Sequence, residues 1–322
     1  MTGGPVRRAA VLGALVADAA SLGLHWLYDA GRLRDLQLGG PLAFRSPTEA
    51  SYAGVAAYFA HAGKKAGDLS PYGESCRLML AHLARRGGVF QRQAYQQEWL
   101  ACFGPGGTWV GYADRPTRRT VVRLLSCATP DDYPAVSGVD DDQLPALECI
   151  PGLVACHRGG FDSLLQVVQQ AVAVTHDDPV ARDAASACAL ALHQVLSGRG
   201  LGQALGAAAE VAGPVLRPLL VEALAMPVLD PQAASTRFGM PCHLPQGLPV
   251  LFHIALSAGS YQEAVEANIL AGGDSCGRSL MLGALCAAEA AVRGVGNAVP
   301  QDWLQGVVTA PAASADLNQL GC

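Results

Sequence analysis

Ala- and Leu-rich segments with apolar residues at helical spacing run through most of the chain, and Gly or Pro bounds nearly all of them. Ala and Leu favour helices, whereas Gly and Pro mark helix ends. Runs in which β-branched or aromatic residues alternate with polar ones are missing, so the sequence predicts essentially no sheet. The predicted helices cover residues 9–28, 74–86, 91–103, 143–157, 161–174, 179–196, 202–211, 261–270 and 277–292. This pattern predicts an all-α fold.

The segments between these helices are too short and too apolar to be domain linkers. Clusters of Gly, Pro, Ser and Asp occupy residues 39–47, 104–107, 130–142 and 238–249, and no internal repeat is visible. A chain of 322 residues is long enough to bury a substantial core. We therefore expect one compact domain over residues 1–322, with residues 311–322 as a loose tail.

Composition and charge exclude several classes of protein. Hydrophobic residues make up 51% of the chain and charged residues 15%, which excludes intrinsic disorder. The formal net charge is −5, without the basic block that a nucleic-acid partner requires. Asp18 interrupts the first apolar run, which is unlike a signal peptide, and no other run is long enough to span a membrane. We expect a cytoplasmic protein without a nucleic-acid or membrane partner.

The ten cysteines are scattered and include no Cys-x-x-Cys pair of the kind that holds zinc. Several lie in Ala- and Leu-rich runs, so we expect small buried hydrophobic side chains. A disulfide framework is typical of smaller secreted chains.

Asp18 lies on an otherwise apolar predicted helix, where an unpaired buried carboxylate would cost several kcal/mol. It therefore needs a partner, either a neighbouring loop, which we favour, or a ligand. His25 follows seven positions later on the same face. A histidine there is either a satisfied core residue or an acid–base catalyst.

Two acidic segments lie at predicted helix starts. Ser70 and Pro71 indicate a turn into a helix that has Glu74 in its first turn, where the helix dipole alone favours an acid. Asp140, Asp141 and Asp142 are consecutive. They are either capping residues, which we favour, or an oxygen-rich cation site, and the pattern does not say which of them faces a cleft.

A glycine-rich corner, Gly272-Gly273-Asp274, joins two predicted helices. Glycine lets backbone approach a ligand closely, and a helix start presents free N–H groups. The segment is either a phosphate or metal loop or an ordinary corner between helices.

Together and in this order, these segments resemble the ADP-ribosylglycohydrolase family, an all-α fold that holds two magnesium ions. Residues 13–19 resemble the family's first Gly-x-x-x-Gly-Asp-Ala helix, and residues 72–75 its Thr-Asp-Asp-Thr loop. Residues 272–277 resemble its Gly-Gly-Asp-x-Asp-Thr loop, and residues 174–179 its Thr-His segment. The resemblance extends over residues 9–293. It implies that the ligand is bound by Asp18, Tyr72, His176, Gly273 and Arg278.

The departures from the family pattern concern its metal ligands. Gly73 and Glu74 stand at the two aspartate positions of the first loop, and Ser75 at its second threonine. Asp274 is retained in the late loop, but Cys276 replaces its second aspartate.

Magnesium prefers a shell of hard oxygen ligands, and cysteine is a soft donor. The resemblance therefore implies at most one Mg²⁺, held weakly by Glu74, Ser75 and Asp274, and a two-ion site is not expected. The family's glutamate near the substrate ribose aligns with His25, so that acidic catalyst is lost.

The altered pattern itself resembles the branch that contains the J-type lens crystallins and related selenoproteins. The matching segments are residues 25–29, 70–74 and 272–278. For this branch the resemblance implies the fold, and it implies an activity only weakly.

Arg278 lies four positions after Asp274, close enough to reach the same pocket. We hypothesise that it supplies, with Arg77, positive charge where the relatives use magnesium, and that in the empty protein it bonds Glu74 or Asp274. The alternative is an ordinary surface arginine.

Three functions fit these residues. The first, which we favour, is hydrolysis of an ADP-ribosyl or related N- or O-glycosidic bond. Glu74 or Asp274 would activate water and His25 would act as acid or base. The second is non-catalytic binding of a nucleotide-like ligand, and the third is a crystallin-like structural role. The expected ligand is ADP-ribose-like, either a small molecule or linked to a protein.

Overall fold

The computed structural model describes residues 3–226, 228–295 and 298–322, and within these ranges the chain is helical, as the sequence predicts. Isolated bridges such as Leu27 with Gly273 are the only β pairing in the described ranges. The α-helices are α1 (Gly3–Ser21), α2 (Ala30–Leu38), α3 (Glu49–Tyr52), α4 (Pro71–Arg85), α5 (Arg92–Phe103), α6 (Arg115–Leu125), α7 (Ile150–Cys156), α8 (Phe161–Val172), α9 (Pro179–Leu196), α10 (Leu201–Glu210), α11 (Gly213–Leu224), α12 (Pro231–Phe238), α13 (Leu244–Ser257), α14 (Tyr261–Leu270), α15 (Ser275–Val292), α16 (Gln301–Gly306) and α17 (Ala310–Gln319).

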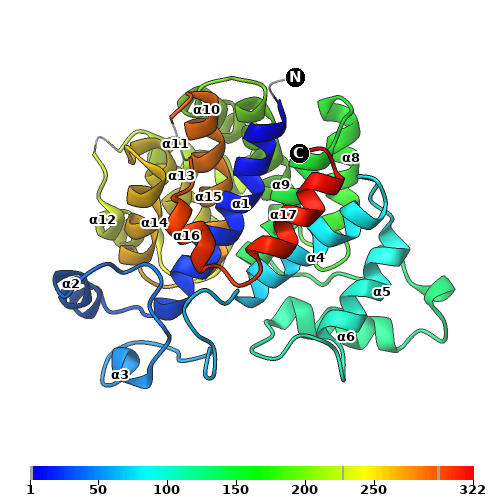
Figure 1. Ribbon diagram of the computed structural model, residues 1–322, viewed down its shortest axis with the longest axis horizontal. Coiled ribbons are helices and arrows are strands. Elements are labelled where there is room, and N and C mark those ends of the chain that lie inside the picture. The colour runs from blue at the N-terminus through cyan, green and yellow to red at the C-terminus, as the bar shows by residue number, and fades with distance from the viewer. Residues whose placement is uncertain (1–2, 227, 296–297) are drawn as a thin grey trace.

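Helices α1 and α15 pack against each other at the centre of the molecule (Figure 1). A Cβ atom at Gly13 would lie 2.6 Å from the carbonyl oxygen of Gly283, and one at Gly283 would lie 2.3 Å from that of Gly13. Only glycine permits this approach of the two backbones. Residues 275–288 of α15 are buried without interruption, so this helix is surrounded by protein on every side.

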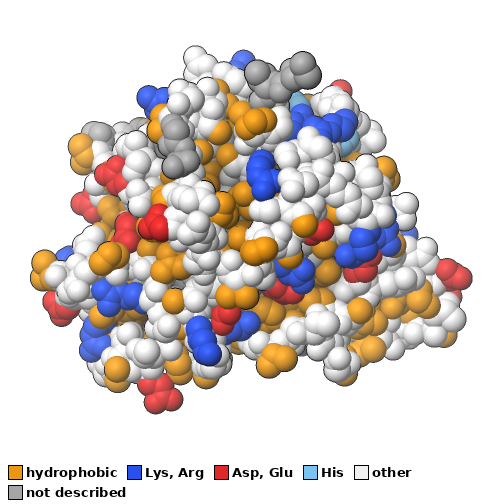
Figure 2. Space-filling model, in the orientation of Figure 1, with side chains coloured by type: hydrophobic (Ala, Val, Ile, Leu, Met, Phe, Trp, Pro, Cys, Tyr) orange, Lys and Arg blue, Asp and Glu red, His pale blue; other side chains and the backbone are white. Residues whose placement is uncertain are grey.

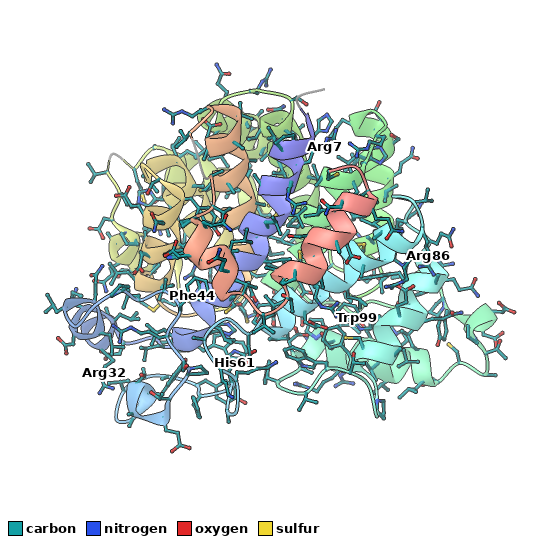
Figure 3. The ribbon with its side chains drawn as sticks, viewed as in Figure 1. Arg7, Arg32, Phe44, His61, Arg86 and Trp99 are labelled. Carbon is teal, nitrogen blue, oxygen red and sulfur yellow. The ribbon has the colours of Figure 1, made fainter. Side chains whose placement is uncertain are left out.

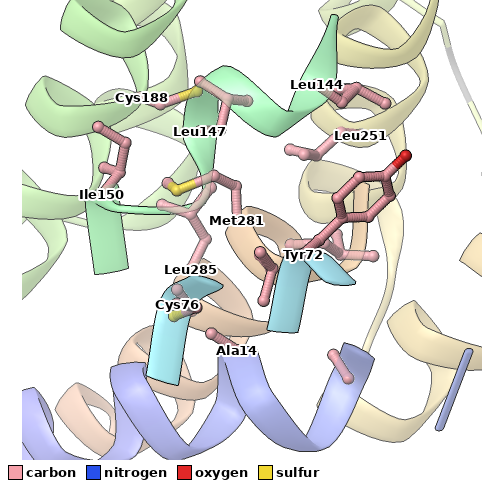
Figure 4. Packing of buried hydrophobic residues seen from close by; sticks show 14 of the residues in the cluster. Ala14, Tyr72, Cys76, Leu144, Leu147, Ile150, Cys188, Leu251, Met281 and Leu285 are labelled. Carbon is pink, nitrogen blue, oxygen red and sulfur yellow. The ribbon is translucent and has the colours of Figure 1, made fainter. Parts of the chain in front are cut away.

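Helices α4, α7, α9 and α13 pack around this central pair. Their buried side chains form one continuous core, which joins residues far apart in the sequence (Figure 4). In that view, Ala14 of α1 faces Cys76 of α4 and Leu285 of α15. The chain is therefore a single compact helical domain.

Several connecting segments meet beyond the last turn of α1. The backbone of Trp26 donates to Gly273 O at 2.8 Å, and Gly273 N donates to Leu27 O at 2.8 Å. On the other side Tyr58 N donates to Trp26 O at 2.9 Å. The segment 25–28 is therefore held between the corner before α15 and the loop 53–66. This pairing explains why the first helix ends at Ser21 instead of Tyr28.

Other helix boundaries also differ from the sequence prediction. Predicted helix 143–157 is divided into a 3₁₀ turn, Leu144–Leu147, and α7, because Pro145 and Pro151 each lack a backbone donor. The predicted loop 238–249 contains the start of α13, where Pro245 occupies a first-turn position that tolerates proline. The pattern did not identify α2, α3, α6, α11, α12, α13, α16 and α17.

The prediction of a loose tail at residues 311–322 is wrong. Most of this segment forms α17, which packs against α1 and α4. Ala313 and Leu317 are fully buried, and Arg8 donates to Asn318 Oδ1 at 3.0 Å. Apolar residues at helical spacing in this segment form the face of α17 that packs against α1 and α4.

In the described ranges, none of the helices combines the length and hydropathy needed to cross a membrane. On the face shown in Figure 2, basic and acidic side chains are interspersed. This distribution agrees with the absence of a basic block in the sequence.

Candidate functional site

A chain of three buried polar side chains lies where the segments beyond α1 meet. His25 Nε2 is 2.8 Å from Asp274 Oδ1, and His25 Nδ1 is 2.7 Å from His61 Nε2. His25 and Asp274 have no exposed surface, and His61 is 2% exposed. Three separate parts of the sequence thus supply one hydrogen-bonded unit.

The carboxylate fixes the direction of these hydrogen bonds. An ionised carboxylate can only accept, so His25 Nε2 carries the proton that is donated to Asp274. Burial, together with the nearby His25 and Lys64, lowers the pKa of His61 to about 2, so this ring is neutral. With a neutral His25 ring, Nδ1 accepts from the Nε2–H of His61. We assign these tautomers from the hydrogen-bond pattern.

Local backbone structure places each member of the chain. Asp274 is the N-cap of α15, where Oδ1 also accepts from Gly277 N at 2.8 Å. His25 follows a single 3₁₀ turn, and Trp26 after it has φ of 63°, a conformation unusual for a bulky residue. His61 lies on the loop 53–66, beyond the end of α1 (Figure 3).

Sequence reasoning missed His61. It is an isolated histidine in a segment without helical periodicity, and nothing in the pattern marks it as the partner of His25.

Aromatic side chains enclose the histidines. The ring of Trp26 stacks on His25 with centroids 4.0 Å apart, and Tyr72 meets His25 edge-on at 5.6 Å. Tyr58 and Tyr112 pack in turn against Trp26, at 5.5 and 4.9 Å. Because Trp26 is 6% exposed and Tyr58 is 54% exposed, Tyr58 forms the solvent side of this cluster.

The carboxylate of Asp18 is hydrogen-bonded to the residue that caps the start of α4. It accepts from Ser70 N at 2.8 Å and from Ser70 Oγ at 2.5 Å, which is the structural partner expected from the sequence. Burial raises the pKa of Asp18 to about 7, although the Ser70 hydrogen bonds act against this shift. A Cβ atom at Gly73 would lie 2.1 Å from Asp18 Oδ2. This contact explains why glycine occupies a position where the family pattern has aspartate.

Glu74 binds a neighbouring arginine and makes no hydrogen bond to the histidines. It forms two hydrogen bonds with Arg77, at 2.5 and 3.0 Å, and it lines a cavity of about 230 Å³ together with Lys64 and Trp109. Ser75 instead lines a cavity of about 10 Å³, large enough for one water molecule, beside the buried Glu148.

Glu148 was not singled out from the sequence. Burial raises its pKa well above the usual range, and Asp114 adds to the shift.

The three predicted magnesium ligands therefore do not converge. Glu74 faces Arg77, Ser75 faces the Glu148 cavity, and Asp274 bonds His25. Within the described ranges, no group of three or more His, Cys, Asp or Glu side chains is placed to hold a metal ion. Cys276, which replaces a family aspartate, directs its thiol to the carbonyl of Asp18 at 3.8 Å. This donor set does not fit a magnesium ion.

Arg278 is fully buried, and the ion pair expected with Glu74 or Asp274 does not form. Its guanidinium donates to Asn268 Oδ1 at 2.8 Å, to Asn268 O at 3.0 Å and to Gly272 O at 2.6 Å. These carbonyls lie at the C-terminal end of α14, where unpaired acceptors and the helix dipole attract a cation. Burial lowers the pKa of Arg278 to about 10, and the charge of Asp274 opposes that shift.

The remaining predicted ligand residues divide into two groups. Tyr72 and Gly273 lie beside the histidines, but a Cβ atom at Gly273 would be 2.1 Å from Met240 O, so its backbone faces protein. His176 lies elsewhere, at a bridge with Val139, and its Nδ1 is 2.9 Å from Thr175 Oγ1. Burial lowers the pKa of His176 to about 3.

Of the three consecutive aspartates, Asp141 faces inward. It is 4% exposed, pairs with Arg115 at 2.7 Å and accepts from Gln143 N. Asp142 pairs with the half-exposed His243 at 2.5 Å, and Asp140 is exposed. Asp141 thus fixes the turn that leads to the next helical segment.

Known proteins resemble this chain over nearly its whole length. The family model described as ADP-ribosylglycohydrolase matches residues 7–321. Crystallin J1A of Tripedalia cystophora is 26% identical over 312 residues, which cover 92% of this chain and 90% of the crystallin. Crystallin J1B of the same animal is 26% identical over 313 residues, with the same coverage.

A solved structure titled "ADP-ribosylglycohydrolase-related protein complex" has the same fold. It aligns with a TM-score of 0.72 at 18% identity, over 99% of this chain and 98% of its own. The motifs, the fold and the family model agree. The chain belongs to the ADP-ribosylglycohydrolase family.

Proposed function

We propose that this protein hydrolyses an ADP-ribosyl or related N- or O-glycosidic bond without magnesium, with His25 as general base and Asp274 as the residue that orients it. The observation that carries the proposal is the hydrogen-bonded chain from Asp274 through His25 to His61. A carboxylate that fixes one imidazole nitrogen leaves the other as a proton acceptor, which is the arrangement a general base requires.

The proposed mechanism excludes magnesium because of the donor set. His25 Nε2 and Gly277 N occupy Asp274 Oδ1, and Arg77 occupies both oxygens of Glu74, which leaves only Asp274 Oδ2 without a hydrogen-bond partner among these carboxylate oxygens. A single such oxygen does not supply the shell of oxygen ligands that magnesium needs. Magnesium also gains little from a thiol at position 276. Each step is therefore assigned to side chains of this chain.

In the proposed reaction, His61 leaves His25 when the loop 53–66 moves outward. A water molecule then occupies the position vacated by His61, and His25 Nδ1 takes its proton as the oxygen attacks the anomeric carbon. The bond between the anomeric carbon and the leaving nitrogen or oxygen breaks as the new bond forms. Asp274 stabilises the His25 imidazolium, which then gives its proton to the leaving group. Glycines with positive φ, Gly54 and Gly63, lie at two points of the loop and allow such a movement.

The aromatic cluster supports an ADP-ribose-like substrate. The exposed Tyr58 and the partly exposed Tyr112 offer flat apolar faces beside Trp26, and such faces bind nucleobases and sugar rings by stacking. The ammonium of Lys64, in the same loop as Tyr58, lies 4.0 Å from the centre of the Trp109 ring and supplies a positive charge that suits a diphosphate.

The test is release of ADP-ribose from peptides ADP-ribosylated on arginine or on serine, in EDTA and in magnesium. The proposal expects release in EDTA, loss of release in His25→Ala and Asp274→Asn, and no change in His193→Ala, a partly exposed histidine of α9. A requirement for magnesium, or full activity in His25→Ala, would contradict it.

The complete burial of the candidate site residues favours a second function. Asp18, His25, Asp274 and Arg278 all have no exposed surface, and Tyr72 is 1% exposed. A crystallin-like or other non-catalytic role needs only the fold, so these side chains would serve as buried packing. Absence of ADP-ribose binding in calorimetric titration, with and without magnesium, would favour this role over hydrolysis.

A further inference from the structure

Two cysteines meet at the end of the molecule opposite the histidine site. Cys156 is the last residue of α7, and Cys322 follows α17. The Sγ atom of Cys322 is 3.8 Å from the carbonyl oxygen of Ala155, the residue before Cys156, so the two thiols are neighbours and influence each other's pKa. Figure 1 shows the start of α1 and the end of α17 in this region.

Two arginines surround this thiol pair. Arg158 donates to Cys322 Sγ at 3.3 Å and to Leu320 O at 2.9 Å. Arg7 of α1 donates to Ala155 O at 2.7 Å and to His157 O at 2.9 Å, and Figure 3 shows it at the same end of the molecule. Positive charge next to sulfur favours the thiolate, which is the nucleophilic form of cysteine.

The two thiols differ in their pKa values. The hydrogen bond from Cys156, helped by Arg158, lowers the pKa of Cys322 to about 6. The hydrogen bond to Cys322, together with burial, raises the pKa of Cys156. Cys322 is half-buried and Cys156 is 3% exposed, so an outside reagent meets the more acidic thiol first.

We propose that Cys322 and Cys156 are a redox-reactive pair, in which a hydroperoxide oxidises Cys322 and Cys156 resolves the product to a disulfide. The inference is independent of the proposed hydrolase activity. It rests on the approach of the Cys322 sulfur to the residue next to Cys156, the Arg158 hydrogen bond and the difference in exposure between the two thiols.

The reaction balances with hydrogen peroxide as the oxidant. The Cys322 thiolate attacks one peroxide oxygen, the O–O bond breaks, and hydroxide leaves and is protonated to water. Cys322 is then a sulfenic acid. The sulfur of Cys156 attacks this sulfur, the S–O bond breaks, and a second water leaves with the thiol proton. Two electrons from the two sulfurs have reduced the peroxide to two waters.

The disulfide would fasten the end of α17 to the end of α7. Helix α17 packs against α1 and α4, so the bond closes a loop that contains about half of the chain. A disulfide that closes a loop of this length restricts the unfolded chain, so the oxidised protein is expected to have a higher Tm than the reduced protein.

The first test measures the reactivity of each thiol. Folded protein is treated with iodoacetamide between pH 5.5 and 8.5, and each cysteine is followed by peptide mass mapping. Cys322 should react at least tenfold faster at pH 7 than Cys127 and Cys242, which are also partly exposed. Arg158→Gln should slow the reaction of Cys322 and move its pH midpoint upward, while Arg199→Gln, an exposed arginine elsewhere, should not. Equal rates for the three cysteines would overturn the proposal.

The second test identifies the oxidised product. Limiting hydrogen peroxide should yield a Cys156–Cys322 peptide that is lighter by two hydrogens and that disappears on reduction. In Cys156→Ser, dimedone should label Cys322 as a sulfenic acid, whereas Cys127→Ser should behave like the parent protein. If the oxidised parent protein contains no linked peptide, or a linkage between other cysteines, the pairing is wrong. The melting temperature of each variant before oxidation establishes that it is folded.

Discussion

Asp274 and His25 form a hydrogen bond of 2.8 Å across 249 positions of sequence, and neither side chain has any exposed surface. The bond links the start of α15 to the segment that follows α1. It also fixes the use of Oδ1, which accepts from both His25 Nε2 and Gly277 N, whereas Oδ2 is buried without a hydrogen-bond partner. The aspartate that this chain shares with the family pattern thus serves as the partner of a histidine.

Truncation of Asp274 should destabilise the protein more than loss of an ordinary helix cap. Asp274→Ala removes the acceptor for Gly277 N, which costs about 1 kcal/mol, and leaves a buried His25 nitrogen without a partner, which costs about 1–3 kcal/mol more. The control is Asp178→Ala, the cap of α9, which should cost only about 1 kcal/mol. Urea denaturation measures both, and equal losses would contradict the proposed role of the His25 bond.

Asp18 should make stability depend on pH in a defined direction. Its pKa rises from 3.8 to about 7 on folding, so the native state holds a proton that the unfolded chain has released between these values. The stability that this group contributes is present below pH 4 and is lost as the pH rises through 7.

The Asp18→Asn variant isolates this effect from histidines with lowered pKa, such as His61 and His176, which act in the opposite direction. Relative to the variant, the parent protein should lose about 2–3 kcal/mol of unfolding free energy between pH 5 and pH 8. Denaturation at the two pH values gives this difference, and a value independent of pH would contradict the raised pKa.

Gly73 should not tolerate the family's aspartate. A Cβ atom there would lie 2.1 Å from Asp18 Oδ2, so Gly73→Asp adds both a clash and a second buried charge, and Gly73→Ala adds the clash alone. We expect Gly73→Ala to cost about 2–3 kcal/mol and Gly73→Asp to cost more. Gly206→Ala in α10, where the new methyl meets nothing within 4 Å, should instead stabilise by about 0.5–1 kcal/mol. Thermal denaturation of the three variants tests this order.

The stability of the protein should depend on the guanidinium group of Arg278 and not only on its positive charge. Arg278→Lys cannot satisfy Asn268 Oδ1, Asn268 O and Gly272 O together, so buried acceptors lose partners at a cost of about 1–3 kcal/mol. Arg217→Lys, which keeps an exposed pair with Glu210, should change stability by less than about 0.5 kcal/mol. Similar effects in the two variants would show that the carbonyl contacts contribute little.

The sequence pattern predicts the correct bounds of two helices that have a capping residue or a proline at their start. The predicted helices 179–196 and 261–270 have the bounds of α9 and α14, because proline or serine starts them and their apolar spacing is regular. The helix pattern failed at α13 and α17. Pro245 and Pro249 lie in a segment that the pattern predicts to be a loop. Proline in a first turn, such as Pro245, is compatible with a helix, and tertiary packing supports the helix at Pro249.

The sequence by itself determined the all-helical fold and the family resemblance, and it singled out His25 and Asp274 as candidate site residues, because spacing and motif order carry that information. Only the tertiary structure decided what each polar side chain faces. It paired Glu74 with Arg77, directed Arg278 to the carbonyls of Asn268 and Gly272, and brought His61 to His25. The physical reason is that a buried polar group takes whatever partner packing places within about 3 Å, and that partner commonly comes from a distant part of the chain.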